Sequence, residues 1–265
     1  MSMRTLAPAA AILLTWALTL SAEEDLTAKR IMEISQEKVE ADDQQSLADF
    51  KIVSKRGKVI DRKLETFAKQ VSDDEERRFL RFLEPGDIKG TILLTYDREA
   101  KDKDDDMWLF LPALGKARRI SASEKSDRFV GSDLTFEDME SIDTENLDFT
   151  ILRSEEYGGL DCWVIEGVPG NEKTKRQSGY SKRNFWVDKE YFLVRQIHFF
   201  SKRKERHIKV SRFDDMRKIE GSEQYRLYRS ETEDLVKGSK TIMTSTSIEI
   251  NKGIEDKIFS KRMLK

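Results

Sequence analysis

From about residue 47 onward, the chain is a series of short segments in which apolar residues alternate with polar ones or run together. Phe, Ile, Val, Tyr and Thr are frequent in them, and sequences such as "EPGD", "YGGLD" and "VKGSK" separate them. Both features are typical of β-strands joined by turns. The pattern predicts strands at residues 47–54, 58–68, 77–83, 89–97, 106–112, 117–121, 147–156, 160–167, 180–188, 191–200, 206–214, 223–231, 241–250 and 256–260.

The connections between these strands are too short for the crossover helices that parallel neighbours need. The sheet is therefore expected to be antiparallel, and a sheet of so many strands curls. The expected fold class is mainly β with a few helices (α+β).

Some of the strands are apolar on both faces and need cover on both sides. In "MWLFL", Trp108 and Phe110 share one face, and Met107, Leu109 and Leu111 share the other. A curved sheet with helices and a cavity on its concave face gives that cover, and so does a fully packed core. By alternation, the face of Trp108 and Phe110 also takes residues from neighbouring strands, namely Leu80, Phe82, Ile92, Leu94, Phe149 and Ile151.

Two stretches have helical character. Residues 24–43 carry Leu26, Ile31, Ile34 and Val39 on one side, after a candidate N-cap at Thr27.

The stretch "RFVGSDLTFEDM", residues 128–139, offers Thr135 as an N-cap and Asp138 three residues later, which is capping-box spacing. Leu134 and Met139 occupy the two positions of a hydrophobic staple. We therefore predict a short helix here, held by its own cap.

The first 22 residues differ from the rest. A lone Arg4 precedes an uncharged stretch from Thr5 to Leu20, and Ser21 and Ala22 follow it. This is the pattern of a secretory signal peptide with cleavage near Ala22. A retained anchor is the weaker alternative, because the stretch is short for a membrane span. Residues 23–265 are expected to form a single domain. The 48 basic and 50 acidic residues nearly balance, which argues against a nucleic-acid partner.

The sequence contains no convincing catalytic or metal-binding motif. Ser132 lacks the G-x-S-x-G context of an esterase nucleophile, and neither His198 nor His207 has a spacing that links it to that serine. "DKDDDMWLFLPA" matches only the first calcium-ligand spacings of an EF-hand and then fails. Cys162, the only cysteine, alternates with Leu160 and Val164 and is expected to be a small buried residue. We expect no enzyme activity, no metal and no cofactor.

Five segments together resemble the bacterial outer-membrane lipoprotein-sorting family, the LolA/LolB-like group. They are "FLEPGDIKGTILL" (residues 82–94), "WLFLPALGKARRI" (108–120), "FVGSDLTFEDM" (129–139), "WVDK" (186–189) and "IEDKIFSKRML" (254–264). The resemblance implies an unclosed, strongly curved antiparallel β-barrel with an N-terminal helix, a helical lid and an apolar cavity for acyl chains. It also implies a location in the periplasm. Members of this branch of the family are often associated with exporters of the resistance-nodulation-division (RND) type, so the resemblance also implies a possible inner-membrane partner of that type.

On this hypothesis the protein is a non-catalytic periplasmic carrier of lipid or of lipoprotein acyl chains. Gly131 is the expected hinge and Met139 part of the lid, while Phe129 and Phe136 join the lipid-binding residues named above. The alternative is a non-enzymatic accessory or structural protein of an envelope complex, which would have a filled core and would act through protein contacts. The sequence leaves the cargo, the donor, the acceptor and the oligomeric state open.

Overall fold

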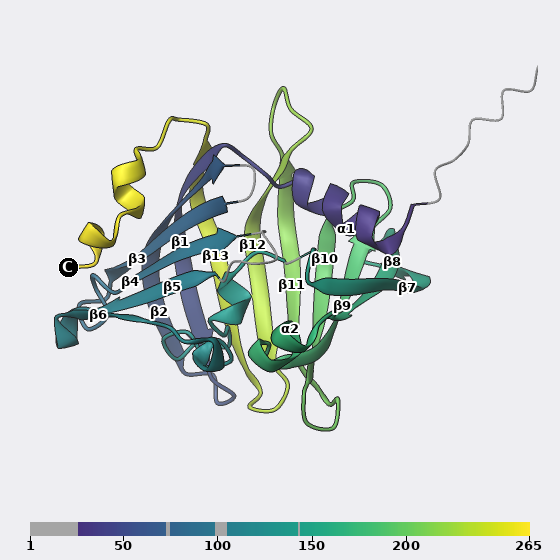
Figure 1. Ribbon diagram of the computed structural model, residues 1–265, viewed down its shortest axis with the longest axis horizontal. Coiled ribbons are helices and arrows are strands. Elements are labelled where there is room, and N and C mark those ends of the chain that lie inside the picture. Colours follow the sequence, from purple (N-terminus) through teal and green to yellow (C-terminus); the bar gives the residue numbers. More distant parts are fainter. Residues whose placement is uncertain (1–25, 73–74, 99–104, 143) are drawn as a thin grey trace, which may run out of the picture.

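The computed structural model describes residues 26–72, 75–98, 105–142 and 144–265. Thirteen strands form one sheet in the order β6-β5-β4-β3-β2-β1-β13-β12-β11-β10-β9-β8-β7, and Figure 1 shows the sheet curling into a trough. The strands are β1 (Asp43–Val53), β2 (Val59–Ser72), β3 (Glu75–Glu84), β4 (Ile92–Arg98), β5 (Asp106–Leu111), β6 (Lys116–Arg119), β7 (Leu147–Tyr157), β8 (Leu160–Pro169), β9 (Tyr180–Asp188), β10 (Val194–Ser201), β11 (His207–Lys218), β12 (Tyr225–Asp234) and β13 (Ser239–Ile250).

The sheet is a set of sequential hairpins on either side of one long-range pairing. Each strand from β1 to β6 pairs with the next one, as does each strand from β7 to β13, and β1 then pairs antiparallel with β13 at the centre. In the described part of the chain the edge strands β6 and β7 do not pair with each other. The antiparallel, mainly β fold and the unclosed curl are as the sequence predicts.

All predicted strands but the last exist, with ends that differ by at most four residues. The exception is the piece at residues 256–260, where the 3₁₀ turn η4 (Asp256–Phe259) takes the place of a strand. The reason is that Phe259 is a single buried anchor on the outside of the sheet, not one of an alternating series. A second turn, η5 (Lys261–Met263), follows it.

Helix α1 (Ala28–Glu37) confirms the N-terminal prediction, with the Thr27 hydroxyl accepting a hydrogen bond from the Arg30 backbone N–H at 3.2 Å. It is shorter than predicted, and Leu26 and Val39 are exposed. Helix α2 (Glu172–Gln177) lies in a stretch whose sequence is typical of a turn, and Asn171 caps it. Short 3₁₀ turns η1 (Pro112–Leu114), η2 (Ala122–Glu124) and η3 (Glu137–Met139) complete the list.

The strands β3 to β5 are covered on both faces. Their inner side chains, which include Leu80, Phe82, Leu93, Met107 and Leu109, pack with Phe129 and Phe136. Their outer side chains pack against the C-terminal segment around Ile254 and Phe259, and this outer cluster contains Phe79, Ile92, Leu94, Trp108 and Phe110.

The register corrects the expectation that the apolar residues of these strands share one face. Ile92 pairs with Phe110 and Leu94 with Trp108, whereas Leu80 pairs with Leu93 and so lies on the opposite side. Both sets are apolar, so alternation alone could not show which set of one strand continues which set of the next. Ile92, Leu94, Trp108 and Phe110 face outward, away from Leu80 and Phe82.

The other end of the trough is closed by α1. Ala28, Ile31 and Met32 pack on the inner face of β8 to β10, where Ile165, Phe185 and Ile197 are buried. In Figure 1, α1 lies across this end of the sheet. The two packed clusters leave the middle of the concave face between them.

Candidate functional site

A cavity of about 1200 Å³ occupies the concave face between the two packed clusters. Its walls come from the strands β1 to β4 and β9 to β13, from both helices and from residues 134 and 137–142. A volume of this size exceeds the roughly 300–1000 Å³ of most small-molecule pockets. The lining is partly apolar, with Leu80, Leu93, Phe185, Ile197, Phe199, Phe213, Leu227 and Met243.

The middle of the cavity wall is made of small hydroxyl side chains. Ser211 and Thr232 share a hydrogen bond of 2.7 Å between neighbouring strands, and their residues are almost fully buried. Ser46 and Thr66 are bonded in the same way at 2.6 Å. These hydroxyls are uncharged and hydrogen-bonded to each other, so this part of the wall carries no charge, and its small side chains leave space that larger ones would fill.

Residues 128–142, here called the crossing segment, connect the two sides of the trough. Arg128 and Asp133 attach it to β12 and β13: the Arg128 guanidinium bonds both Asp133, at 2.9 Å, and Asp234. Asp133 also accepts hydrogen bonds from the Ser239 hydroxyl at 2.6 Å and the Thr241 hydroxyl at 2.9 Å.

The predicted capping contacts of Thr135 and Asp138 form, but around a single 3₁₀ turn and not a helix. The Thr135 N–H donates to the Asp138 carboxylate at 2.7 Å, and the Asp138 N–H donates to the Thr135 hydroxyl at 3.3 Å. The turn η3 ends at Met139 because the chain continues into an extended Glu140. The prediction of a helix here is therefore wrong in length, although its capping pair is right.

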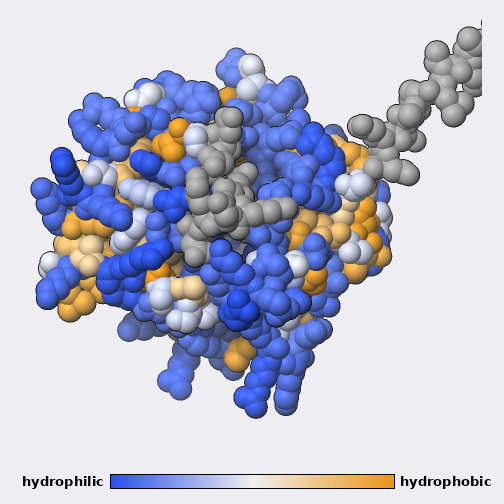
Figure 2. All heavy atoms as spheres, in the orientation of Figure 1, coloured by the Kyte–Doolittle hydropathy of each residue, from blue (hydrophilic) through white to orange (hydrophobic). Residues whose placement is uncertain are grey.

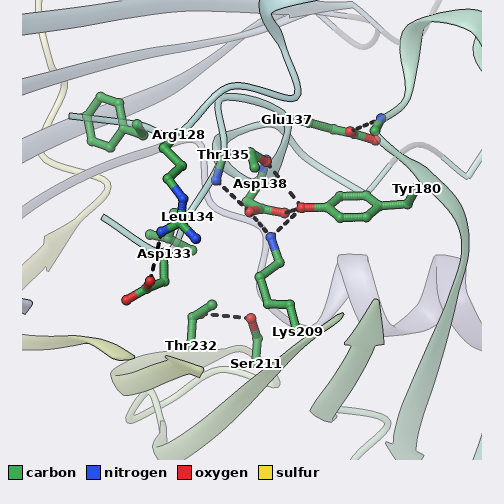
Figure 3. Close-up of polar contacts among 12 residues, drawn as sticks. Arg128, Asp133, Leu134, Thr135, Glu137, Asp138, Tyr180, Lys209, Ser211 and Thr232 are labelled. Carbon is green, nitrogen blue, oxygen red and sulfur yellow. Dashed lines mark hydrogen bonds and ion pairs between the residues drawn. The ribbon is translucent and has the colours of Figure 1, made fainter. Parts of the chain in front are cut away.

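Asp138 also forms a buried cluster with Lys209 and Tyr180. Figure 3 shows the Lys209 ammonium and the Tyr180 hydroxyl pointing at the Asp138 carboxylate, from β11 and β9 respectively. Burial alone raises the pKa of a carboxyl, but the charge and hydrogen bond of Lys209 hold the pKa of Asp138 below its usual value. Burial and the neighbouring carboxylates raise the pKa of Tyr180 well above its usual value, so this phenol stays protonated and donates.

Glu137 makes a second attachment on the same side. Its carboxylate pairs with Arg183 of β9 and accepts hydrogen bonds from the Ser178 hydroxyl at 2.6 Å and the Gly179 N–H at 2.7 Å. The crossing segment is thus fixed to β9 and β11 by charged groups that are shielded from water.

On the opposite side, a buried charged group ties the segment to β3 and β4. Arg78 lies 3.4 Å from Asp97 and also pairs with Glu76, and its guanidinium donates to the Ser141 hydroxyl. Glu140 forms an ion pair with Lys125 at 2.6 Å. Burial raises the pKa of Asp97 to about 6 and that of Glu140 to about 8, against the opposing effects of Arg78 and Lys125.

Ser132 has a structural contact and no catalytic one. It is fully buried, and its hydroxyl donates to the Phe129 carbonyl at 2.8 Å. Gly131, beside it, has φ +79°, a conformation that favours glycine. Cys162 is buried as expected, and burial raises the pKa of its thiol to about 11. Among the described residues, no group of three or more His, Cys, Asp or Glu side chains is placed to hold a metal ion.

The predicted lipid-binding residues fall into five places. Leu80 lines the cavity, as does Met139 of the expected lid. Phe82, Phe129 and Phe136 are fully packed in the inner cluster beside it, and Phe149 packs in the cluster under α1. Ile151 is partly exposed on the edge strand β7. Ile92, Leu94, Trp108 and Phe110 are on the outer face and do not line the cavity.

Several lining residues were missed by the sequence reasoning, above all Ser211, Ser230, Thr232 and Met243. They lie in strands of modest hydrophobicity. A signal was present in β11 to β13, where serine and threonine recur at alternate positions that a packed core would fill with Val, Ile or Leu.

Comparison with known proteins supports the fold over nearly the whole chain. A protein domain from Vibrio parahaemolyticus assigned to outer membrane lipoprotein sorting is 25% identical, with 89% of this chain and 97% of that chain covered and a TM-score of 0.82. A DUF1329 family protein from Desulfovibrio piger is 29% identical over 90% of this chain and 96% of that chain, with a TM-score of 0.81. A family model described as "Uncharacterized protein" matches residues 74–265.

The chain belongs to the LolA-like, outer-membrane lipoprotein-sorting family. A LolA superfamily protein from Nitrosomonas europaea shares the fold at 22% identity, with 89% of this chain and 98% of that chain covered and a TM-score of 0.69. None of the curated proteins compared with it matches the chain.

In this chain the cavity lies on the concave face of one curved sheet. In the part of the chain that is described, no helix is both long and apolar enough to cross a membrane. The predicted signal segment, residues 1–22, lies outside the described residues.

Proposed function

We propose that the protein is a non-catalytic periplasmic carrier that holds acyl chains of a lipid or a lipoprotein in the cavity of its curved sheet. The observation that carries the proposal is the large cavity between two packed clusters, in a chain of the LolA-like family. Shielding an acyl chain from water is worth about 0.8 kcal/mol per methylene. The apolar part of the lining supplies such shielding without any reaction.

The placement of charge supports an amphipathic cargo. Leu227, Phe213 and Met243 line the interior, whereas Arg30 and Glu33 of α1 also border the cavity from a partly exposed helix. A lipid bound with its chains inside would therefore have charged side chains near its polar group. On this proposal the crossing segment acts as the lid, with Gly131 as hinge, and residues 23–265 act as one domain behind a signal peptide.

Release of the cargo requires the wall formed by the crossing segment to move. Phe129 and Phe136 anchor one part of this segment in the inner cluster, whereas its attachments to β9, β11, β3 and β4 are ion pairs and hydrogen bonds that can be exchanged for other partners. An exporter of the resistance-nodulation-division type remains part of the proposal only as a donor or acceptor of the cargo.

The test is native mass spectrometry and lipid extraction of the purified protein, followed by displacement of a fluorescent fatty acid. Ser230→Phe should plug the cavity and lower probe affinity by about tenfold or more, because the new ring occupies space that the chain needs. Thr244→Phe, on the exposed outer face of the adjacent strand, is the matched control and should bind normally.

An empty protein with no affinity for the probe would reject the carrier function. It would favour the alternative, an accessory protein of an envelope complex that works through protein contacts.

A further inference from the structure

One end of the sheet carries a row of exposed basic turns, here called the basic edge. It consists of the β1–β2 turn (residues 54–58), the β10–β11 turn (202–206), the β12–β13 turn (235–238) and helix α2. Antiparallel pairing forces them to the same end: Val53 pairs with both Val59 and Lys240, and Lys209 pairs with Asp234. In Figure 1 they project together along the lower side.

Direct contacts join the row. The Leu235 N–H donates to the Ile208 carbonyl at 2.9 Å, so the second and third turns are neighbours. The Lys202 ammonium donates to the Arg176 carbonyl at 3.0 Å, which places α2 beside the β10–β11 turn. Gly238 lies against the side chain of Lys55. The basic edge is therefore continuous from the β1–β2 turn to α2.

The basic edge is strongly positive. With the border residues Asp234 and Lys240 included, it contains three acidic residues, Glu172, Glu205 and Asp234, against the basic residues Lys55, Arg56, Lys58, Lys173, Lys175, Arg176, Lys202, Arg203, Lys204, Arg206, Lys237 and Lys240. Most of these side chains are exposed. Within the described parts of the chain, Arg56, Arg203 and Lys237 have no carboxylate within ion-pair distance. Their charge is free to meet an external partner.

Apolar side chains protrude among these charges. Val59 and Ile60 beside the first turn are 47% and 40% exposed, and Leu235 and Val236 in the third turn are 38% and 57% exposed. Figure 2 shows hydrophilic chains extending from this edge with apolar surface between them. Val59 and Ile60 begin β2 directly after the first turn, and Leu235 and Val236 belong to the third turn itself.

The turns at the opposite end of the same strands have a different character. The β7–β8 turn is Gly158–Gly159, and the β11–β12 turn carries Glu220 and Glu223 without a basic residue between them. Positive charge with apolar tips is thus a property of one end of this sheet and not of its turns in general.

We propose that the basic edge docks the protein on a membrane surface that displays anionic phospholipid headgroups. Each Lys or Arg near such a surface strengthens binding about fivefold, and short apolar tips enter the headgroup boundary. The proposal gives the carrier function a site of exchange, because α2 lies in the basic edge and its Lys173, Thr174 and Gln177 also line the cavity. Only this link between docking and cargo exchange rests on the proposed function, since docking on a membrane needs no cargo.

The test is co-sedimentation of the full-length mature protein with vesicles of phosphatidylcholine alone and of an equal mixture of phosphatidylcholine and phosphatidylglycerol. The variant Arg56→Glu/Arg203→Glu/Lys237→Glu reverses one charge in each turn. The control Lys252→Glu/Arg262→Glu/Lys265→Glu makes the same change in net charge at exposed positions outside the basic edge. The three-turn variant should bind mixed vesicles at least about 100-fold more weakly than the wild type, and the control should bind like the wild type.

Retained binding by the three-turn variant, or equal losses in both variants, would overturn the proposal. So would failure of the wild type to prefer the mixed vesicles, which would point instead to an acidic protein partner for this edge. Two measurements separate membrane docking from the carrier function. In the fatty-acid displacement assay the three-turn variant should still bind the probe, and in co-sedimentation Ser230→Phe should still bind mixed vesicles.

Discussion

The strands β3 to β5 and the strands β11 to β13 belong to one sheet but carry different kinds of side chain on their inner faces. On β3 to β5 the inner face holds Leu80, Phe82, Leu93 and Leu109, and side chains of the crossing segment fill the space above them. On β11 to β13 the same face holds Ser211, Ser230, Thr232 and Thr241, with Met243 among them, and a cavity lies above it.

The difference shows that the most hydrophobic part of a curved sheet is the part that packs. Large apolar side chains gain free energy by touching each other, so they pack with Phe129 and Phe136, and of these inner side chains only Leu80 and Leu93 also border the cavity. The hollow persists where side chains are short and their hydroxyls already have partners. A cavity for an apolar chain is thus found where the sheet is less apolar than elsewhere.

The strongest test of this comparison introduces a glutamate into each of the two regions in turn. Phe110→Glu should unfold the protein, because it removes a buried ring and puts a charge between the sheet and the C-terminal segment, at a cost of several kcal/mol against a typical total of about 5–15. Ser230→Glu, on the cavity wall, should remain folded. Circular dichroism with urea titration measures both, and a stable, native Phe110→Glu protein would contradict the assignment of the outer face as a packed core.

A second, smaller effect concerns the attachment of the crossing segment above the cavity. Lys209→Met leaves the Asp138 carboxylate buried without its cation and should lower the free energy of unfolding by about 3–5 kcal/mol. Adding Asp138→Asn should restore a large part of this loss, because the unpaired charge is gone. Lys240→Met breaks the more exposed pair with Glu231 and should cost less than about 1 kcal/mol. If the two lysine variants proved equal in urea titrations, the buried cluster would not be what holds the segment.

The attachment on the β3 to β5 side should make stability depend on pH. The pKa of Glu140 is raised to about 8 in the folded protein, so between its ordinary value and about 8 the folded state binds a proton that the unfolded chain releases. Stability should therefore fall as pH rises, by roughly 3 kcal/mol between about pH 5 and about pH 8. In Glu140→Gln this slope should become flatter. An unchanged slope in the variant would show that another group carries the dependence.

The smallest expected effect belongs to the capping pair. Thr135→Ala removes the hydroxyl that accepts from the Asp138 N–H and should cost about 0.5–1 kcal/mol. Ser132→Ala should leave any ester hydrolysis of the preparation unchanged, because that hydroxyl is fully buried. Loss of hydrolysis in the serine variant alone would argue for an enzyme.

Much of the fold follows from the sequence because alternation and turn chemistry act over a few residues. The N-cap at Thr27, the Thr135–Asp138 pair and nearly every strand are local features of this kind. The site is not local. Leu94 and Leu93 are equally apolar, and only their pairing with Trp108 and Leu109 decides which one faces the trough.

The recruitment of Lys209 by Asp138 is likewise invisible in a sequence where 37% of residues are charged. Charged residues in a strand usually indicate a solvated face, and here one of them is almost fully buried. Ser211 and Thr232 were missed for a related reason, since a hydroxyl side chain is weak evidence for any surface until its neighbours are known.

The pairing of β1 with β13 has a consequence for how the molecule assembles. Gln44 pairs with Ile250, whereas all other neighbours in the sheet are consecutive in the chain. The strands β1 to β6 and the strands β7 to β13 can therefore each form from local hairpins. The pairing of β1 with β13 needs contact between distant parts of the polypeptide, and such contacts form slowly. Almost the whole sequence must therefore be available before the trough, and with it the cavity, can form.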